Sequence, residues 1–361
     1  MKETYFSLGL MSGTSMDGVD VSIIRSDGID EYKPIYNEFF SYDNELNTDL
    51  YYWREKIEKE NDISKFKLDL LNLEKKITIF HAKVTNKIIN KNITKIDLIG
   101  FHGHTIFHDG DKKISYQLGD GNLLSQLTKK KIIYNFREND LKNGGQGAPL
   151  TPIFHKLLYK NINKDKVSFL NIGGISNETI IINNKIISAK DVGPGNCLID
   201  KWIRINTKKN FDDKGEIANS GKVDKIILEN AIDFFLNNKL SKKKSLDIHD
   251  FDISFVRGLS INDGAATLTE FTAEIISINI NNKNIYACGG GRKNNFLINT
   301  IESKIRNKIN MIDDIDIDGD FIESQAFAYL AIRSYLDLPI TFSETTGCKF
   351  PSKGGTLVEN F

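Results

Sequence analysis

A cluster of small polar residues near the N-terminus has the composition of a phosphate-binding turn. Apolar residues lead into Gly13, Thr14 and Ser15, and the chain leaves along an alternating apolar run at residues 19–24. This pattern predicts a strand, a tight turn and a strand, with Gly13 and Gly18 free to adopt positive φ. Such a turn directs backbone N–H groups and two hydroxyls to one point, which suits a phosphate chain. The turn lacks the Gly-Lys-Ser/Thr ending of a Walker loop, and a hairpin without a ligand explains the pattern alone equally well.

Two further glycine-rich turns follow apolar runs later in the chain. Residues 173–177 (GGISN) separate the runs 167–172 and 179–182, and residues 289–294 (GGGRKN) connect the run 284–288 to a helix. A glycine-rich turn that enters a helix can hold an anion at the helix N-terminus. Each half of the chain opens with strand, turn and strand, which suggests duplicated halves without proving them. Three such turns favour a nucleotide cleft between two α/β lobes over three unrelated structural turns.

Asp191 is the candidate for catalysis. It lies just before a Gly-Pro-Gly turn at residues 193–195, where the backbone is rigid and little side-chain bulk is nearby. A carboxylate in that position can accept a proton from water or from a hydroxyl group. Capping of the following turn or helix is an equally good interpretation of an Asp beside Gly.

Two histidines and an arginine follow apolar strands in the first half. His102 and His104 come after the run 96–101, where we expect a loop. No Cys or carboxylate cluster of suitable spacing completes a metal site with them, so contacts to substrate or backbone are preferred. Arg137 follows the run 132–136 and suits a carboxylate or phosphate, although a surface ion pair is the default for such a residue.

Length and composition restrict the number of domains, the class of partner and the location that we expect for this protein. The chain has 361 residues, so two domains are expected rather than one core. Its formal net charge is zero, which argues against nucleic acid or a membrane surface as partner. The three cysteines form no Cys-x-x-Cys pair, which favours reduced thiols. The first predicted strand starts directly, without a signal peptide, and no apolar run could span a bilayer, so we expect a soluble cytoplasmic protein.

The elements that must position the candidate residues alternate between strands and helices. Apolar residues recur every three or four positions from Leu70 to Ile88, which predicts a long helix with one buried stripe. Further helices are predicted at residues 46–59, 122–129, 198–202, 223–235, 268–278 and 323–335, and a further strand at 114–118. This alternation predicts an α/β fold with a substantially parallel sheet, followed by a short irregular tail.

Seven motifs, taken in chain order, are more specific than any single turn. They are residues 11–20 (MSGTSMDGVD), 102–105 (HGHT), 117–120 (QLGD), 143–150 (NGGQGAPL), 171–177 (NIGGISN), 191–196 (DVGPGN) and 288–291 (CGGG). Together they resemble the anhydro-N-acetylmuramic acid kinase family, and the resemblance runs from residue 5 to about residue 335.

The resemblance implies a two-lobed, ribonuclease-H-like α/β fold of the actin and hexokinase type, with a nucleotide cleft between the lobes. With the glycine-dense stretch 143–149 taken as the boundary, residues 1–140 and about 338–361 form an N-terminal lobe, and residues 141–337 form a C-terminal lobe. The resemblance also implies a homodimer.

The implied activity is an ATP- and Mg²⁺-dependent kinase reaction in peptidoglycan recycling. ATP, water and a small-molecule anhydro amino sugar, 1,6-anhydro-N-acetylmuramic acid, would give N-acetylmuramic acid 6-phosphate and ADP. The family's catalytic aspartate maps onto Asp191, with the implied role of general base for the water that attacks C1. Two alternatives stay open: a sugar kinase of the same superfamily without the coupled hydrolysis, and a nucleotide-binding regulator. Asp191 favours an enzyme over the regulator, because a switch needs no base beside the phosphates.

The residues assigned to ligands fall into two sets. The nucleotide set is Gly13, Thr14, Ser15, Met16, Asp17, Gly18, Val19, Asp20, Gly173, Gly174, Asn177, Gly289, Gly290, Gly291 and Asn294. The substrate set is His102, Asp120, Arg137, Gly195, Asn196 and Glu323, with Arg137 as a candidate for the lactyl carboxylate.

Some positions depart from the family and superfamily pattern. Met11 and Asn171 stand where many superfamily members carry acidic residues that serve Mg²⁺. Asp17, Asp20 and Glu323 are possible substitutes, and the sequence does not choose among them. Residues 137–140 keep fewer arginines than the family's usual stretch, and residues 243–251 differ from its Ser-Thr-Gly-Arg-Glu-like pattern.

Overall fold

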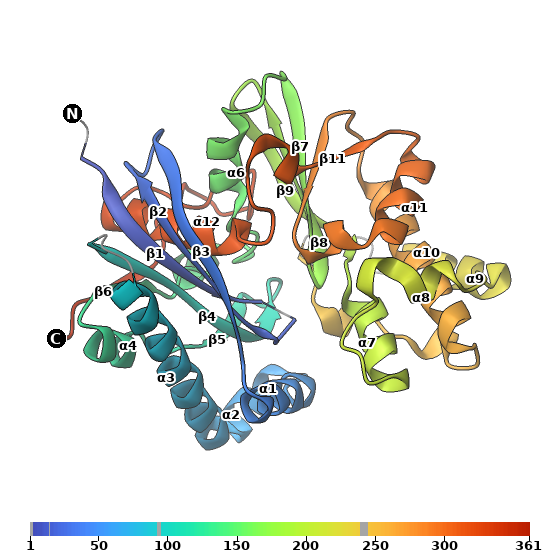
Figure 1. The fold of residues 1–361 in the computed structure, drawn as a ribbon, viewed down its shortest axis with the longest axis horizontal. Coiled ribbons are helices and arrows are strands. Elements are labelled where there is room, and N and C mark those ends of the chain that lie inside the picture. Colours follow the sequence, from blue (N-terminus) through green and yellow to red (C-terminus); the bar gives the residue numbers. More distant parts are fainter. Residues whose placement is uncertain (1–2, 14, 92–94, 239–244) are drawn as a thin grey trace. The chain divides into compact units, whose positions relative to one another are not determined.

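The computed structural model describes residues 3–13, 15–91, 95–238 and 245–361 (Figure 1). Thr14, which the sequence assigns to the nucleotide, lies outside the described residues, as does the start of the 243–251 segment. The chain divides into two compact units: unit 1 is Met1–Leu158 with Phe321–Phe361, and unit 2 is Tyr159–Asp320.

Unit 1 is built on a mixed sheet with the order β12-β6-β4-β1-β2-β3, in which β5 also pairs with β4. Its strands are β1 (Tyr5–Ser12), β2 (Gly18–Ser26), β3 (Tyr32–Ser41), β4 (Leu98–Asp109), β5 (Ile114–Leu118), β6 (Lys131–Tyr134) and β12 (Thr356–Val358). Its helices are α1 (Asn44–Lys56), α2 (Glu60–Lys65), α3 (Lys67–Lys91), α4 (Gly121–Thr128), α5 (Glu138–Lys142), α6 (Pro152–Tyr159) and α12 (Ile322–Tyr335).

Helices α3 and α12 cover opposite faces of this sheet. Side chains alternate between the two faces along a strand. On β4, the ring of Phe101 lies 5.0 Å from that of His81 on α3, whereas a Cβ built on the neighbouring Gly100 would lie 2.2 Å from the Phe327 carbonyl oxygen of α12. The apolar stripe predicted for α3 is confirmed, because Leu70, Ile77 and Ile88 are buried.

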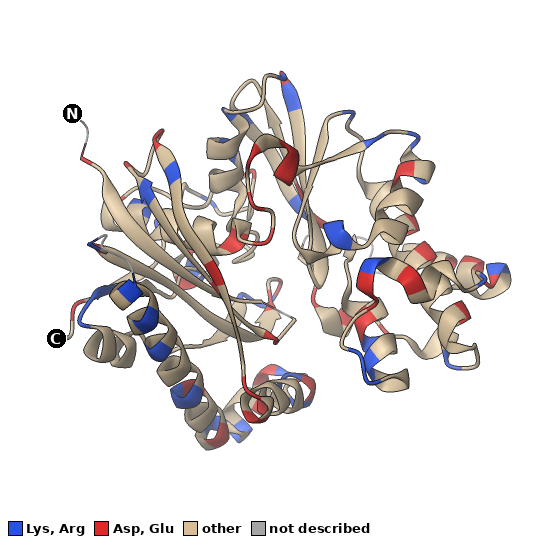
Figure 2. Cartoon of the chain, in the orientation of Figure 1, with Lys and Arg blue, Asp and Glu red and all other residues tan. Residues whose placement is uncertain are grey.

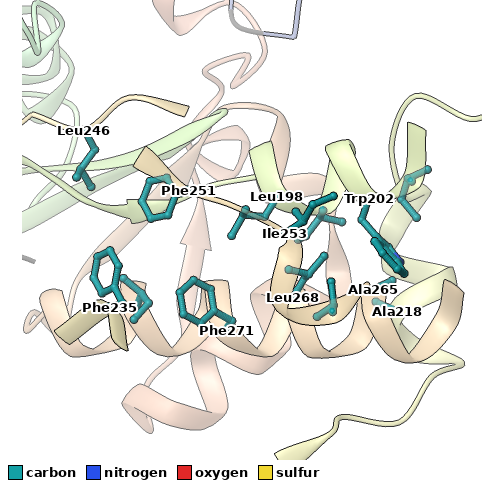
Figure 3. Close-up of a cluster of buried hydrophobic side chains, with 14 residues drawn as sticks. Leu198, Trp202, Ala218, Phe235, Leu246, Phe251, Ile253, Ala265, Leu268 and Phe271 are labelled. Carbon is teal, nitrogen blue, oxygen red and sulfur yellow. The ribbon is translucent and has the colours of Figure 1, made fainter. Parts of the chain in front are cut away.

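Unit 2 is built on a second mixed sheet with the order β11-β10-β7-β8-β9. Its strands are β7 (Lys166–Ile172), β8 (Ile175–Ile182), β9 (Lys185–Pro194), β10 (Ile285–Cys288) and β11 (Ile309–Met311), and its helices are α7 (Cys197–Asn206), α8 (Glu216–Asn219), α9 (Lys225–Asn237), α10 (Ile261–Asn279) and α11 (Asn295–Ile305). A cluster of buried side chains joins α7, α9 and α10 to residues 246–256; it includes Trp202, Phe235, Leu246, Phe251 and Phe271 (Figure 3).

The two units share one strand order. In each, three successive strands are antiparallel (β1, β2, β3 and β7, β8, β9), and two later strands (β4, β6 and β10, β11) lie parallel to the first. This order is that of the ribonuclease-H-like fold, so the expected α/β fold class is confirmed. The expectation of a substantially parallel sheet is wrong, because both sheets are mixed.

The unit boundaries differ from those expected. The glycine-dense stretch 143–149 and helix α12 both belong to unit 1, which ends its first segment at Leu158 and resumes at Phe321. The physical reason is packing: Phe154 of α6 contacts the rings of Tyr32 on β3 and Tyr329 on α12, with centroids 5.3 and 5.8 Å away. The tail is not wholly irregular either, because β12 pairs antiparallel with β6.

Charged side chains of both signs are interspersed over each unit, in keeping with the zero net charge (Figure 2). Within the described part of the chain, no helix combines the length and the apolar character needed to cross a membrane.

Candidate active site

The β1–β2 connection forms the predicted hairpin turn, but its backbone differs from the expectation. Gly13 and Gly18 do not have positive φ; the left-handed residue is Met16, with φ 56°. The Met16 N–H donates to the Gly13 carbonyl at 3.1 Å, and Ser15 Oγ donates to Asp17 Oδ1 at 2.5 Å. Gly18 is needed for space, since a Cβ there would lie 2.2 Å from the Phe40 carbonyl oxygen on β3.

The hairpin also places a carboxylate opposite Met11. Met11 on β1 pairs in register with Asp20 on β2. Opposed residues on antiparallel strands have Cβ atoms about 4.5–5.5 Å apart. Asp20 therefore lies beside Met11, whereas the neighbouring Val19 is buried in the core of unit 1.

A chain of hydrogen bonds fixes the end of β1 beneath this turn. The Tyr42 hydroxyl donates to Ser12 Oγ at 2.8 Å, and Ser12 Oγ lies 2.9 Å from His104 Nδ1. Burial lowers the pKa of His104 to about 3, so its imidazole is neutral and Nδ1 can accept from Ser12. The expectation of a loop at His102 and His104 is wrong: both residues lie within β4. In the described residues, no group of three or more His, Cys, Asp or Glu side chains is placed to hold a metal ion.

His102 and Arg137, both assigned to the substrate, are in direct contact. Arg137 Nη2 lies 2.9 Å from His102 Nε2, and Arg137 Nη1 donates to the Gly147 carbonyl at 2.7 Å. His102 Nδ1 lies 2.9 Å from the Gly103 carbonyl oxygen, which can only accept. Burial, followed by the positive charge of Arg137, holds the pKa of His102 well below its usual value. The neutral imidazole therefore donates from Nδ1 and accepts the arginine N–H at Nε2.

The other two substrate residues of unit 1 lie apart from each other. Asp120 caps α4, where its side chain accepts from the N–H groups of Asn122 and Leu123, and its own N–H donates to Thr78 Oγ1 of α3 at 3.0 Å. It therefore lies on the α3 side of the sheet and lines a pocket of about 610 Å³ in unit 1 together with Tyr134, Asn135 and Glu138. Glu323 is half-buried in the first turn of α12, on the opposite face.

The hairpin turn between β7 and β8 in unit 2 packs on the turn at residues 193–196 that follows Asp191. The N–H of Asn196 donates to the Gly173 carbonyl at 2.8 Å, and the N–H of Gly195 donates to the Gly174 carbonyl at 2.9 Å. A Cβ on Gly195 would lie 2.1 Å from the Gly173 carbonyl oxygen, so this approach requires glycine. Four residues assigned to different ligands are thus brought together by backbone contacts.

The third glycine-rich turn lies against the same strand end. Gly289 has φ 78°, and a Cβ there would lie 2.4 Å from Asn171 Oδ1. Gly291 packs on Ile172, whereas a Cβ on Gly290 would meet nothing within 4 Å. Asn294 has a structural task of its own as the N-cap of α11, where its side chain accepts from the Leu297 N–H.

Asp191 lies on β9 at the centre of this group. It pairs in register with Asn177 on β8, and its Oδ2 accepts a hydrogen bond from the Leu246 N–H at 2.7 Å. The N-cap of α7 is Asn196, so Asp191 is not the cap of that helix. The buried Asn177 Oδ1 has no hydrogen-bond partner among the described residues. A held carboxylate and an unsatisfied amide oxygen on facing strand positions can orient a water or hydroxyl group.

Sequence reasoning missed three contacts that hold the candidate residues. Leu246 follows the polar stretch of the sequence before it, and its burial in the cluster of Figure 3 is the property that fixes its N–H on Asp191. Asn47 and Tyr51 of α1 donate to carbonyl oxygens of the first turn. Their spacing of one helical turn was visible in the sequence, but nothing there indicated which loop they face.

These features define a class of protein: an α/β chain of two ribonuclease-H-like units, with a glycine-rich hairpin turn after the first strand of each and an aspartate held beside the second turn. The model of the family described as anhydro-N-acetylmuramic acid kinase matches residues 5–360. The chain belongs to the anhydro-N-acetylmuramic acid kinase family. The family and the kinase class expected from the sequence are therefore confirmed.

Similar proteins from several bacteria carry the name anhydro-N-acetylmuramic acid kinase. The chain is 52% identical to that of Pelagibacter ubique, with 100% of both chains covered. It is 36% identical to that of Agrobacterium fabrum, covering 99% and 100%, and 35% identical to that of Zymomonas mobilis, covering 97% and 99%. The matching solved structures have much lower sequence identity. The activator of 2-hydroxyisocaproyl-CoA dehydratase from Clostridium difficile is 12% identical, with a TM-score of 0.45, and the match covers 92% of this chain and 96% of that chain. The fold assignment therefore depends on the strand order itself.

Proposed function

We propose that this kinase phosphorylates 1,6-anhydro-N-acetylmuramic acid at O6 and hydrolyses its anhydro bridge, giving N-acetylmuramic acid 6-phosphate and ADP. The names of the relatives support this sugar as the substrate, and one observation supports the coupled hydrolysis. Asp191 is oriented by the Leu246 N–H and pairs in register with Asn177, whose buried Oδ1 has no hydrogen-bond partner among the described residues. A plain phosphoryl transfer to an existing hydroxyl is the alternative.

Asp191 acts as general base in this proposal. It takes a proton from a water whose oxygen forms the new bond to C1. The C1–O6 bond breaks with its electron pair on O6, O6 bonds to the γ-phosphorus, and ADP leaves. The Leu246 N–H fixes the orientation of the carboxylate through its hydrogen bond to Oδ2.

The nucleotide is assigned to three turns. The first hairpin offers backbone N–H groups to the phosphates of ATP, while residues 173–174 and 289–291 supply backbone that a ligand can approach closely. Gly290 fits this role best, since nothing lies within 4 Å of its Cβ position.

Mg²⁺ fits the acidic residues of the first hairpin. Magnesium is commonly held by one or two carboxylates together with phosphate oxygens and waters, so a three-residue cluster is not required. Asp20 lies beside Met11, and Asp17 is tied to Ser15 in the same turn. We assign these two carboxylates to the ion in preference to Glu323 of α12. When bound, the ion neutralises charge on the transferring phosphoryl group.

Arg137 is assigned to the lactyl carboxylate of the sugar. Its guanidinium is oriented by two uncharged acceptors, His102 Nε2 and the Gly147 carbonyl. Arginine is suited to carboxylates because its N–H groups form a planar fork. The proposal also includes a homodimer and a cytoplasmic place in cell-wall recycling; sedimentation of the purified chain tests the former.

The decisive experiment follows ADP release and isotope incorporation with the purified protein, ATP, Mg²⁺ and the anhydro sugar in ¹⁸O-labelled water. Label at C1 of the phosphorylated product, sampled before anomeric exchange, is the expected result. Unlabelled phosphorylated product would support the plain kinase, and no ADP above background would contradict both.

The matching substitution is Asp191→Asn, which removes the base and keeps the size of the side chain. We expect turnover to fall by about 10²–10⁴-fold, the usual contribution of general base catalysis, with ATP binding near that of the wild type. Asp233→Asn, at an exposed position on α9 of the same unit, is the control and should be fully active. An active Asp191→Asn enzyme would remove Asp191 from this role.

A further inference from the structure

We propose that Asn47 and Tyr51 of α1 are positioning residues for the nucleotide turn between β1 and β2. They hold the carbonyl groups of the turn away from the phosphates, so that its N–H groups are already arranged when ATP arrives. This inference rests on the proposed function, in which that turn binds the phosphates of ATP.

Three consecutive carbonyl groups of the turn accept hydrogen bonds from residues 42–51. The Tyr51 hydroxyl donates to the Ser15 carbonyl at 2.7 Å, and Asn47 Nδ2 donates to the Met16 carbonyl at 2.7 Å. The N–H of Tyr42, just before α1, donates to the Asp17 carbonyl at 2.9 Å. Across a planar trans peptide, the N–H points opposite to the C=O. The N–H of Asp17 is therefore directed away from Asn47 of α1, and the N–H of Gly18 is directed away from Tyr42.

Helix α1 is itself held in place by a side-chain cap, by buried leucines and by ion pairs to α3. Asp43 caps it by accepting from the Leu46 N–H at 2.8 Å, and Leu46 and Leu50 are buried beneath it. Asn47 and Tyr51 are one helical turn apart and so share one face. Lys76 of α3 contacts both Glu45 and Asp49 at 2.8 Å, which adds a second connection to the rest of unit 1.

The turn needs such support because its backbone is strained. Met16 is a non-glycine residue with φ 56°, a region that L-residues avoid. Without bonds to the neighbouring carbonyls, a relaxed turn would compete with this conformation. Affinity for ATP would then fall in proportion to the fraction of molecules in the competent state. A carbonyl that turned toward the ligand would also repel its phosphate oxygens.

The test compares two adjacent tyrosines. Tyr51→Phe removes only the hydroxyl that holds the Ser15 carbonyl, and Tyr52→Phe is the matched control, because the Tyr52 hydroxyl accepts from the exposed Lys56. For full-length protein, ATP and AMP dissociation constants, the KM values of both substrates and Tm are measured. Asn47→Ala and the double variant repeat the test at the second bond.

We expect Tyr51→Phe to raise the ATP dissociation constant and the KM for ATP about 3–10-fold, the order expected for one lost neutral hydrogen bond. AMP affinity, the KM for the sugar and Tm should stay near those of the wild type, and the double variant should bind ATP more weakly than either single one.

Two results would overturn the proposal while leaving the function intact: equal ATP affinity in Tyr51→Phe and Tyr52→Phe, or a parallel loss of ATP, AMP and sugar affinity with a lowered Tm. A wild-type protein that binds no ATP would instead overturn the proposed function, and this inference with it.

Discussion

Alanine at Gly9 or Gly100 is expected to force α12 away from the sheet of unit 1. The two glycines are opposed in register on the parallel strands β1 and β4. A Cβ on Gly9 would lie 1.8 Å from the Ser324 carbonyl oxygen and 2.7 Å from the Ala328 nitrogen, and a Cβ on Gly100 would lie 2.2 Å from the Phe327 carbonyl oxygen. The atoms in the way belong to the helix backbone, so no side-chain rotation relieves the contact.

The size of the effect follows from how far the helix must move. Ordinary contact begins near 3.4 Å, so α12 has to shift by more than 1 Å at either position. Overpacking of a close-packed core costs about 1–3 kcal/mol, and a clash with backbone places both variants at the upper end. For a unit of this size, about 3 kcal/mol lowers Tm by roughly 6–12 °C. The smaller backbone entropy of the unfolded alanine chain offsets less than about 1 kcal/mol of this.

Differential scanning calorimetry measures this loss. The control is Gly258→Ala, since a Cβ on Gly258 meets nothing within 4 Å. Its Tm should lie within about 2 °C of the wild-type value, as for an unstrained surface substitution. If Gly9→Ala and Gly100→Ala unfold at the temperature of the control, α12 does not pack directly on the strand backbone, and its assignment to unit 1 loses its physical basis.

Two further predictions concern buried groups. Burial lowers the pKa of His81 to about 4 and the pKa of His104 and His155 to about 3, so just below pH 6.5 only the unfolded chain takes up these protons. The free energy of unfolding should therefore fall by about 1.4 kcal/mol per histidine for each pH unit below 6.5. A Tm that stays constant from pH 7 to pH 5 would contradict this prediction. Leu246→Ala should loosen the N–H on Asp191 and lower kcat about tenfold, unlike Leu236→Ala at an exposed position. Equal kcat values in the two variants would exclude this role of Leu246.

Local patterns were sufficient for the elements that carry the site. The apolar alternation after residue 19 predicted the first hairpin, and the three-to-four periodicity from Leu70 to Ile88 predicted α3. The glycine-rich turns after β7 and β10 also lie where expected, because a turn between two apolar runs is encoded within a few residues.

Contacts between distant segments were not predictable in this way. The expected boundary of the C-terminal lobe differs from that of unit 2, because α12 belongs to unit 1. This helix packs on glycines of β1 and β4 that lie more than two hundred residues earlier in the chain. The bond from Leu246 to Asp191 and the contact of Arg137 with His102 depend on tertiary packing that no local pattern records. Positive φ was expected at Gly13 and Gly18, but Met16 has the left-handed conformation. Gly18 is required instead for the close approach of β3.

The two hairpin turns occupy equivalent places in the same strand order, yet they are held by different groups. The first has side-chain donors in addition to backbone bonds, with Tyr51 and Asn47 donating to its carbonyl groups. The second is fixed by backbone, with the N–H groups of Gly195 and Asn196 donating to Gly174 and Gly173. A single side-chain substitution can therefore loosen the first turn without disturbing the fold, whereas the second yields only to changes at glycine positions such as Gly195, where added bulk would also move Asp191. Substitutions that separate nucleotide affinity from catalysis should consequently be found around α1, and those in the second turn should affect both together.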